Sequence, residues 1–319
     1  MVAAGSSAGE VYLGVDGGGT KTAYCLISDG VPIAHFRGES IHYLTRGMHV
    51  VEPALRLGIG EVCSVAGIEP GDIAHAFIGI PALGEVRDAI AVLEAIPGRV
   101  LGHDRYACGN DVVCGWAGSL GGADGVHVVS GTGSISYGQY AGQDARAGGW
   151  GELLGDEGSG YWVARQGLNA FTRMSDGRLP RGPLHERVAA ELGIDDDFDV
   201  VDVVLNQWGE ERARIAALSV TVVAAAEAGD PVAAQILQAA AQELARLADA
   251  IAARLDWPAG DQVPVSYSGG MFNATRLFDE FEAALAASPI AYDLRTPAYP
   301  PDEGAAHYAA RLAARTARG

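Results

Sequence analysis

The chain has 319 residues, of which 49% are hydrophobic and 19% charged, and its formal net charge is −18. This length suits two domains with sizeable cores, and so negative a charge disfavours nucleic acid and anionic membranes as partners. The four cysteines form no CxxC pair, which favours free thiols in a reducing cytoplasm over a zinc or redox site. Residues 1–10 read as a flexible tail rather than a signal peptide, and no apolar run reaches the roughly 20 residues that span a bilayer.

The first structured segment, residues 11–36, predicts a three-stranded antiparallel meander. Its apolar runs at 11–15, 23–27 and 31–36 are separated by the turn sequences DGGGT and SDG. The pattern that follows predicts helices over 51–67 and 85–96 and short buried strands over 73–80 and 99–102.

Residues 125–142 follow the same plan as the start of the chain: an apolar strand, a Gly/Thr/Ser turn and an alternating strand. The pattern after residue 160 is helical, with helices predicted over 214–228 and 231–255. A strand over 263–267, a helix near 274–287 and a final helix over about 302–317 complete the chain. The acidic run at 194–202 is interpreted as a solvated loop and helix start rather than a metal site.

The turn from Asp16 to Thr22 contains three consecutive glycines between two strands. Without Cβ atoms, its backbone amides can approach an anion closely, and Thr20 and Lys21 add a hydroxyl and a positive charge. Asp16 could hold a hydrated Mg²⁺ facing phosphates. The segment is not a Walker A loop, because Thr20 precedes Lys21 and a strand follows. Alone, it could also be merely a hairpin turn.

A second such turn, Ser130-Gly131-Thr132-Gly133-Ser134, lies between apolar strands in the other half of the chain. One phosphate-binding turn per domain is what a nucleotide clasped between two domains requires. A third element, residues 268–273 (SGGMFN), follows a strand and opens a helix, where bare backbone admits a flat ring such as adenine.

These three elements, in this order, resemble the phosphate-1, phosphate-2 and adenosine motifs of the actin/hexokinase/acetate-kinase superfamily. Within it, residues 148–162 (GGWGELLGDEGSGYW) resemble the signature of N-acetylglucosamine kinases and their BadF/BadG-type relatives. The resemblance runs from about residue 11 to 313. It implies an α/β chain of two domains with a ribonuclease H-like fold, in which mixed sheets are flanked by helices and a cleft closes over the substrates.

The implied domains are residues 11–115, with the final helix packing back on them, and residues 116–301. The resemblance implies a catalytic aspartate just before the phosphate-2 strand, where Asn110 and Asp111 stand. Asp111 is the predicted base that accepts the proton of the sugar 6-hydroxyl. Asp104 is its rival, and an ordinary helix cap is the structural alternative for Asp111.

The resemblance also assigns the ligands, with Asp16 organising Mg²⁺. The residues implied to hold ATP are Gly18, Gly19, Thr20, Lys21, Gly131, Thr132, Gly133, Ala216, Gly269, Gly270 and Asn273. Those implied to contact the sugar are His42, Asn110, Asp111, Ser134, Gly149, Trp150, Gly151, Asp156 and Glu157. Trp150 and Trp162 could instead be core aromatics, and Glu157 a helix cap.

The chain departs from amino-sugar kinases at His42, which stands where an asparagine usually reads the sugar hydroxyls. An imidazole is bulkier and, when neutral, offers one donor and one acceptor. His42 as a surface histidine is an equal alternative. The function that the resemblance implies is transfer of the γ-phosphoryl of Mg-ATP to the 6-hydroxyl of an amino sugar, with N-acetylglucosamine first. Glucosamine, N-acetylmannosamine, a muramic-type sugar and glucose remain alternatives.

Other classes share the fold. Activators of 2-hydroxyacyl-CoA dehydratases need iron–sulfur cysteines after the phosphate-2 region, and one group of glucokinases needs a Cys₃His zinc loop, but no cysteine follows Cys114. A non-catalytic sugar or nucleotide sensor remains an alternative, although the sequence has no added DNA-binding segment. A cytoplasmic homodimer that binds ATP and a sugar is the expected form.

Overall fold

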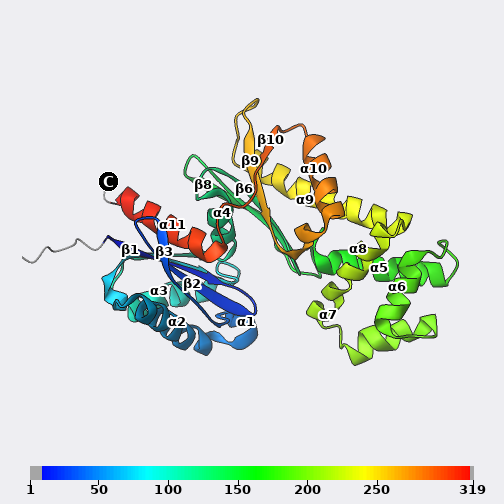
Figure 1. Ribbon diagram of the computed structural model, residues 1–319, viewed down its shortest axis with the longest axis horizontal. Coiled ribbons are helices and arrows are strands. Elements are labelled where there is room, and N and C mark those ends of the chain that lie inside the picture. The colour runs from blue at the N-terminus through cyan, green and yellow to red at the C-terminus, as the bar shows by residue number, and fades with distance from the viewer. Residues whose placement is uncertain (1–8, 317–319) are drawn as a thin grey trace, which may run out of the picture. The chain divides into compact units, whose positions relative to one another are not determined.

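The computed structural model describes residues 9–316 and divides the chain into two compact units (Figure 1). Unit 1 contains the chain up to Ala123 and from Pro297 onward, and unit 2 runs from Asp124 to Thr296. The divisions expected after residues 115 and 301 therefore lie at 123 and 296, because the helix that begins at Val112 packs against the last helix. Residues 1–8 of the expected tail, and residue 317 of the expected final helix, lie outside the described residues.

Unit 1 contains five strands and five α-helices in its described residues, with three short 3₁₀ turns. The strands are β1 (Val11–Gly17), β2 (Lys21–Ser28), β3 (Val31–Glu39), β4 (Ile73–Ile80) and β5 (Tyr106–Asn110). The helices are α1 (Tyr43–Arg46), α2 (Val51–Ala66), α3 (Ile90–Leu101), α4 (Val112–Leu120) and α11 (Pro301–Thr316). The 3₁₀ turns are η1 (Met48–Val50), η2 (Pro70–Asp72) and η3 (Arg87–Ala89).

The sheet of unit 1 has the order β3-β2-β1-β4-β5. β1, β2 and β3 are antiparallel, which confirms the predicted meander, whereas β4 pairs parallel to β1 and β5 parallel to β4. Successive strand residues point to opposite faces. Leu13 and Val15 therefore pack into a core with α2 and α3, while Cys25 and Ile27 pack against α11 on the other face.

Glycines allow α11 to approach the rest of unit 1 at backbone distance. A Cβ on Gly14 would collide with the backbone of Asp302 and Ala306, so β1 carries no side chain where α11 crosses it. Likewise, a Cβ on Gly304 would overlap the backbone of Gly118 in α4. The last helix is therefore a built-in layer of unit 1 rather than a loose appendage.

Unit 2 contains five strands and a larger set of helices. The strands are β6 (Gly125–Ser130), β7 (Ser134–Tyr140), β8 (Gln143–Gly148), β9 (Val263–Ser268) and β10 (Tyr292–Leu294). The α-helices are α5 (Gly160–Ser175), α6 (Pro183–Leu192), α7 (Arg212–Ala217), α8 (Ser219–Glu227), α9 (Pro231–Arg254) and α10 (Thr275–Ala286). The remaining turns are η4 (Asp197–Asp199), the π-helical η5 (Asp202–Gln207) and η6 (Gly270–Asn273).

The sheet of unit 2 has the order β10-β9-β6-β7-β8. β6, β7 and β8 are antiparallel, and β9 and β10 join as parallel strands, so the strands repeat the topology of unit 1 in the same sequence order. The resemblance in plan between residues 125–142 and the first meander is confirmed at the level of topology.

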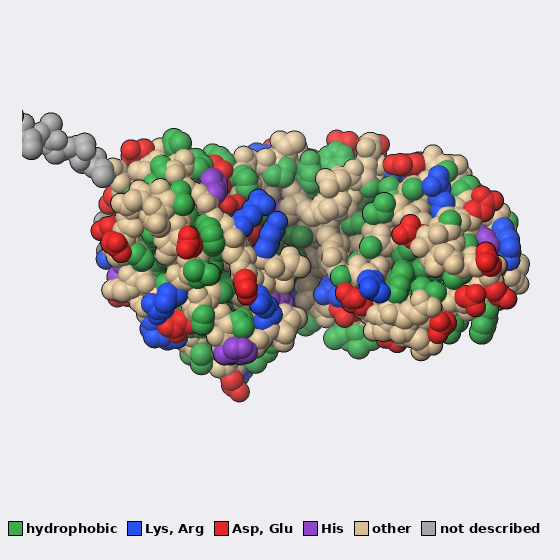
Figure 2. Space-filling model, turned by 60° about the horizontal axis from the view of Figure 1, so that its bottom comes forward, with side chains coloured by type: hydrophobic (Ala, Val, Ile, Leu, Met, Phe, Trp, Pro, Cys, Tyr) green, Lys and Arg blue, Asp and Glu red, His purple; other side chains and the backbone are tan. Residues whose placement is uncertain are grey.

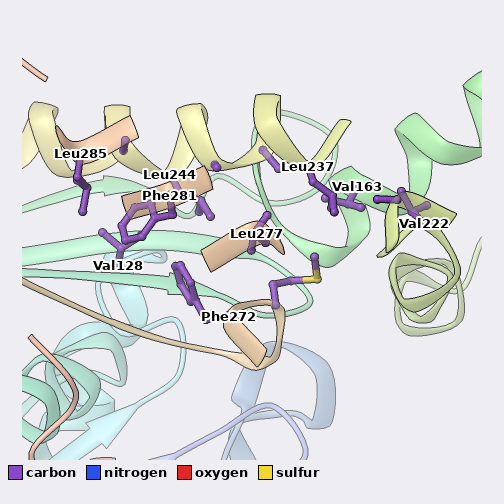
Figure 3. Close-up of a cluster of buried hydrophobic side chains, with 14 of the residues drawn as sticks. Val128, Val163, Val222, Leu237, Leu244, Phe272, Leu277, Phe281 and Leu285 are labelled. Atoms are coloured by element: carbon purple, nitrogen blue, oxygen red, sulfur yellow. The ribbon is translucent and has the colours of Figure 1, made fainter. Parts of the chain in front are cut away.

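The core of unit 2 is formed by α9 and α10 against the sheet, and continues toward α5 and α8 (Figure 3). α9 begins at its N-cap Asp230, whose carboxylate accepts hydrogen bonds from the backbone N–H groups of Val232 and Ala233. Its buried residues, among them Ala233, Leu237, Ala240, Leu244 and Ala248, recur at helical spacing and form one face of the helix. Figure 3 shows Leu237, Leu244 and Phe281 directed into this core.

Three secondary-structure predictions are wrong. Residues 99–102 are the end of α3 and its cap rather than a strand, because Leu93, Ile96 and Val100 continue the helical burial pattern past Pro97. The helix predicted over 85–96 lies at Ile90–Leu101 for the same reason. The single helix predicted over 214–228 is two helices, α7 and α8, that meet at Leu218. β5, β8 and β10 were not predicted.

No helix within residues 9–316 is both long and apolar enough to cross a membrane. On the face shown in Figure 2, lysine and arginine side chains are scattered among acidic ones and form no continuous basic surface.

Candidate active site

The first glycine turn connects β1 to β2 in unit 1. The backbone N–H of Gly18 donates to the carbonyl of Lys21 at 2.9 Å, and the Ser40 hydroxyl donates to the carbonyl of Gly18 at 2.7 Å. A Cβ on Gly19 would meet nothing within 4 Å, and Thr20 and Lys21 are exposed. The turn is thus fixed at its base and open at its tip, as an anion-binding turn requires.

Asp16 stands beside this turn, near the carboxyl end of β1. Burial, followed by the nearby carboxylates of Asp111 and Asp302, raises the pKa of Asp16 to about 7, and Lys21 opposes the shift. These neighbouring carboxylates disfavour the charged form of Asp16, and a divalent cation would relieve that repulsion. Carboxylate oxygens are also the ligands that Mg²⁺ prefers, so the residues present fit the predicted metal.

Asn110 and Asp111 lie at the same edge of the sheet as Asp16. β1, β4 and β5 are parallel, and the register pairs Asp16 with Gly79 and Gly79 with Gly109. Carboxyl ends of parallel strands are the usual place for ligands in α/β folds. A Cβ on Gly79 would lie 3.3 Å from the Cα of Asp111, so a side chain there would crowd the predicted base.

The structure separates Asp111 from its rival Asp104. Asp111 follows the carboxyl end of β5 and begins α4, whereas Asp104 is exposed and precedes the amino end of the same strand. Five extended residues place the two positions roughly 17 Å apart along the strand. The Asn110 side chain accepts from the backbone N–H of Val112 at 3.2 Å, and Asp111 makes no side-chain cap hydrogen bond to α4. Only Asp111 shares an edge with Asp16.

His42 follows β3 and precedes α1, in the same unit as the first turn. Its ring is half-buried, with Nδ1 3.2 Å from the Thr45 hydroxyl. Its backbone N–H donates to the hydroxyl of Ser40, the residue that also holds Gly18. His42 is therefore tied through Ser40 to the glycine turn.

The second turn connects β6 to β7 in unit 2. The N–H of Gly131 donates to the carbonyl of Gly133 at 2.9 Å, and the start of α5 donates to the turn from Gly160 and Tyr161. The hydroxyls of Ser130 and Ser134 donate to the carbonyls of Gly158 and Glu157 at 2.8 and 2.7 Å. The turn and the segment before α5 thus form one hydrogen-bonded body.

The segment from Gly149 to Gly158 is held by unusual backbone conformations. Asp156, which is 2% exposed, has a φ of +59°, and its carboxylate accepts from the N–H of Ser134 at 3.3 Å. Burial raises the pKa of Asp156, while Arg212 and Ser134 oppose that shift. Trp150 is 70% exposed, so its core alternative is wrong, whereas Trp162 packs partly buried against the core.

The sequence allows Glu157 to be a sugar contact or a helix cap, and the structure excludes the cap. The N-cap of α5 is Ser159, whose hydroxyl accepts from the N–H of Trp162 at 3.1 Å. Glu157 is half-buried and contributes its backbone carbonyl to Ser134. The helix-cap alternative for Glu157 is therefore wrong, and its assignment as a sugar contact stays a prediction.

A pocket of about 790 Å³ opens against the second turn, within the size range of small-molecule sites. Predicted nucleotide residues from three distant segments meet there: Gly131, Thr132, Ala216, Gly270 and Asn273. Gly269 lies just behind it, because a Cβ on Gly269 would collide with the backbone of Ser130 and Gly131. The lining is otherwise mostly apolar, as an adenine ring would require.

The sequence analysis missed two residues that lie beside the second turn and its pocket. Arg212 forms ion pairs with Asp156 and Glu152, and its guanidinium lies over Gly133. Val220 is 72% exposed and lines the pocket. No local pattern identifies these residues, because each acts on a segment more than 50 positions away in the chain.

The sequence of the chain matches one family model over most of its length. The model of the BadF/BadG/BcrA/BcrD ATPase family matches residues 13–309. The chain belongs to this family. The predicted family is confirmed, and the family is one of ATPases.

Two curated relatives are similar to this chain over most of their length. One is an N-acetylmuramic acid/N-acetylglucosamine kinase of Clostridium acetobutylicum, 30% identical over 283 residues, covering 86% of this chain and 90% of the relative. The other is an N-acetyl-D-glucosamine kinase of Dictyostelium discoideum, 28% identical over 272 residues, covering 82% and 85%.

Solved structures confirm the predicted fold class. A Chromobacterium violaceum protein, provisionally named an N-acetylglucosamine kinase, superposes with a TM-score of 0.72 at 27% identity, covering 94% of this chain and 99% of that one. A glucokinase of Streptomyces griseus has a TM-score of 0.56 at 19% identity, with 94% and 99% covered. The family fold is therefore the two-unit α/β fold of actin/hexokinase-type sugar kinases.

Proposed function

We propose that the chain is an ATP-dependent kinase that phosphorylates the 6-hydroxyl of an amino sugar, with N-acetylglucosamine as the first candidate. The observation that carries the proposal is the edge of unit 1 where Asp16 and Asp111 stand beside a glycine turn. Phosphoryl transfer needs a cation site, a phosphate cradle and a base, and this edge offers a residue for each. The names of the curated relatives support the same activity.

In the proposed mechanism, Asp111 accepts the proton of the sugar hydroxyl as it attacks the γ-phosphorus. Asp16 would hold Mg²⁺, which when bound supplies charge neutralisation for the phosphates. The backbone amides of the first turn, with Thr20 and Lys21, orient the phosphate tail. In unit 2, the pocket holds the nucleoside and the second turn holds phosphate through Thr132. The loop at Gly149–Asp156 is the proposed sugar-binding segment.

The test is release of ADP from Mg-ATP against N-acetylglucosamine, N-acetylmuramic acid, glucosamine, N-acetylmannosamine and glucose. Strong release with an amino sugar supports the proposal and identifies the acceptor. ATP binding with no turnover on any sugar would favour the sensor alternative and refute the kinase. As partners we propose ATP, the sugar and a second copy of the chain, in the cytoplasm.

His42 is the position at which this chain should differ from amino-sugar kinases that carry asparagine there. We expect His42→Asn to change the ranking of N-acetylglucosamine, N-acetylmuramic acid and glucose in kcat/KM by several-fold, because an amide replaces a bulkier imidazole. The matched control is His49→Asn, since His49 is an exposed histidine in the next turn. An unchanged ranking would place His42 outside the sugar site.

A further inference from the structure

The pocket of unit 2 lacks a positive charge for a ligand that carries phosphates. Among the described residues that line it, Glu227 is the only charged one, and the whole chain carries a net charge of −18. A nucleoside triphosphate brings several negative charges to the pocket end formed by Gly131 and Thr132. A cation close to that end would offset an otherwise unfavourable field.

Arg212 is placed at this end of the pocket. It is the first residue of α7, whose Ala213, Ala216 and Ala217 line the pocket. A Cβ on Gly133 would lie only 2.5 Å from Nη2 of Arg212, so the guanidinium occupies the space directly over the turn. The arginine side chain is 40% exposed, so solvent and ligands can reach it.

Two carboxylates hold Arg212 in this position. Nη2 donates to the buried carboxylate of Asp156, and Nε lies 3.3 Å from Oε2 of Glu152, whose side chain is 42% exposed. The Asp156 contact is a buried, hydrogen-bonded ion pair, whereas Glu152 is partly exposed and its contact with Nε is no hydrogen bond, so the Glu152 contact is the weaker one. A guanidinium has five donors, so it can keep one carboxylate and exchange the other for a phosphate.

We infer that Arg212 is a phosphate ligand of the nucleotide, held over the Gly131–Ser134 turn by Asp156 and competed for by Glu152 when no nucleotide is bound. The inference rests on the proposed function and adds to it a nucleotide-binding residue in unit 2. The structural alternative is that Arg212 only pins the Gly149–Gly158 segment to α7.

Calorimetric titration of the full chain with ADP and with adenosine, without sugar, separates these roles. Arg212→Gln should weaken ADP binding about tenfold to a hundredfold, the size of a lost hydrogen-bonded charge contact, and leave adenosine binding unchanged. Arg212→Lys should be intermediate, because an ammonium keeps the charge without the fork. The matched control is Arg214→Gln, since Arg214 is an exposed arginine of the same helix that pairs with Glu211.

Glu152→Gln gives an effect of opposite sign. Removing the competing carboxylate should strengthen ADP binding about twofold to fivefold, equivalent to the loss of an exposed ion pair. If Glu152→Gln weakens ADP and adenosine binding alike, the ion pairs are structural and the inference is overturned. This variant also decides the matter should Arg212→Gln fail to fold.

The outcomes distinguish this inference from the proposed function. If the wild-type chain binds neither ADP nor adenosine, the proposed function fails and the inference with it. If the wild type binds ADP and Arg212→Gln binds it equally well, only the inference is overturned. Selective loss of ADP binding in Arg212→Gln, with a gain in Glu152→Gln, supports both.

Discussion

Each unit has a five-stranded sheet of the same topology, but the units differ in the segment that connects their third and fourth strands. In unit 1, residues 40–72 between β3 and β4 contain two α-helices, whereas in unit 2 residues 149–262 between β8 and β9 contain five. In unit 1 the connection is short, and the candidate catalytic residues Asp16 and Asp111 lie at the carboxyl ends of the sheet strands. In unit 2 the long connection supplies α5, α7 and α8, which build a pocket against the glycine turn.

The turns differ in the same way. The turn of unit 1 joins an acidic residue, Asp16, to Lys21, which suits a cation and a phosphate together. The turn of unit 2 carries hydroxyls and takes its charge from Arg212 on a separate helix. In the function that we propose, one topology serves a metal-binding edge in unit 1 and a nucleoside pocket in unit 2. Four variants test this division.

The largest expected effect is on the chemistry of unit 1. Asp111→Ala should lower turnover about 10²–10⁴-fold, the usual contribution of a general base, while ADP binding to unit 2 stays intact. The measurements are steady-state kinetics on the accepted sugar and calorimetric titration with ADP. Asp104→Ala is the control, because Asp104 lies beyond the opposite end of β5. Near-normal turnover in Asp111→Ala would refute the assignment.

The next effect concerns the assembly of unit 1. Gly304→Ala should lower the free energy of unfolding by about 1–3 kcal/mol, because its Cβ has no room against the backbone of Gly118. Denaturant unfolding measures it. Gly60→Ala in α2 is the control, since a Cβ there meets nothing within 4 Å and alanine is the better helix former. Equal stability of the two variants would mean that α11 is not tightly packed.

A smaller effect is expected in the pocket of unit 2. Val220→Asp should weaken ADP binding about tenfold, because it removes apolar contact with the base and adds a like charge near the phosphates. Val220 is 72% exposed, so the fold should tolerate the change. Leu205→Asp, at a half-exposed apolar residue outside the pocket, is the control. Unchanged ADP affinity would place the nucleotide elsewhere.

The smallest effect is a pH dependence of stability in unit 2. Burial lowers the pKa of His127 from 6.5 to about 3, and its Nε2 lies 3.0 Å from the Ser268 hydroxyl. Between these values the unfolded chain binds a proton that the folded chain does not, so stability falls as pH decreases below 6.5. His127→Gln should reduce the slope of unfolding free energy against pH by up to about 1.4 kcal/mol per unit. An identical slope would show that His127 is protonated when folded.

Much of the fold was readable from the sequence because glycine turns and apolar runs are local signals. The first meander, the hairpin of β6 and β7, α9 with its Asp230 cap and the two glycine turns were predicted within a few residues. β5 was missed because its five residues are only half-buried and show no alternation. Residues 99–102 were predicted as a strand because four residues are too few to show a helical period, whereas in the structure their buried neighbours continue α3 through Pro97.

The residues of the candidate site also fall into those that a local motif indicates and those that only the fold brings together. Residues inside motifs, such as Asp16 and Thr132, could be proposed from the sequence, and their roles stay predictions. Arg212 could not, because its partner Asp156 lies 56 positions away and only the folded chain brings them together. The break between α7 and α8 at Leu218 could not be predicted either, because no glycine or proline stands there in the sequence.

The return of α11 to unit 1 has a consequence for how the protein is made. When the strands of the first sheet have left the ribosome, the face that carries Cys25 and Ile27 has no cover, and the whole of unit 2 must be translated before α11 arrives. At ordinary rates of synthesis that delay is on the order of ten seconds or more. The unit that is translated first is therefore completed last, and during the interval its bare face is a natural client for a chaperone.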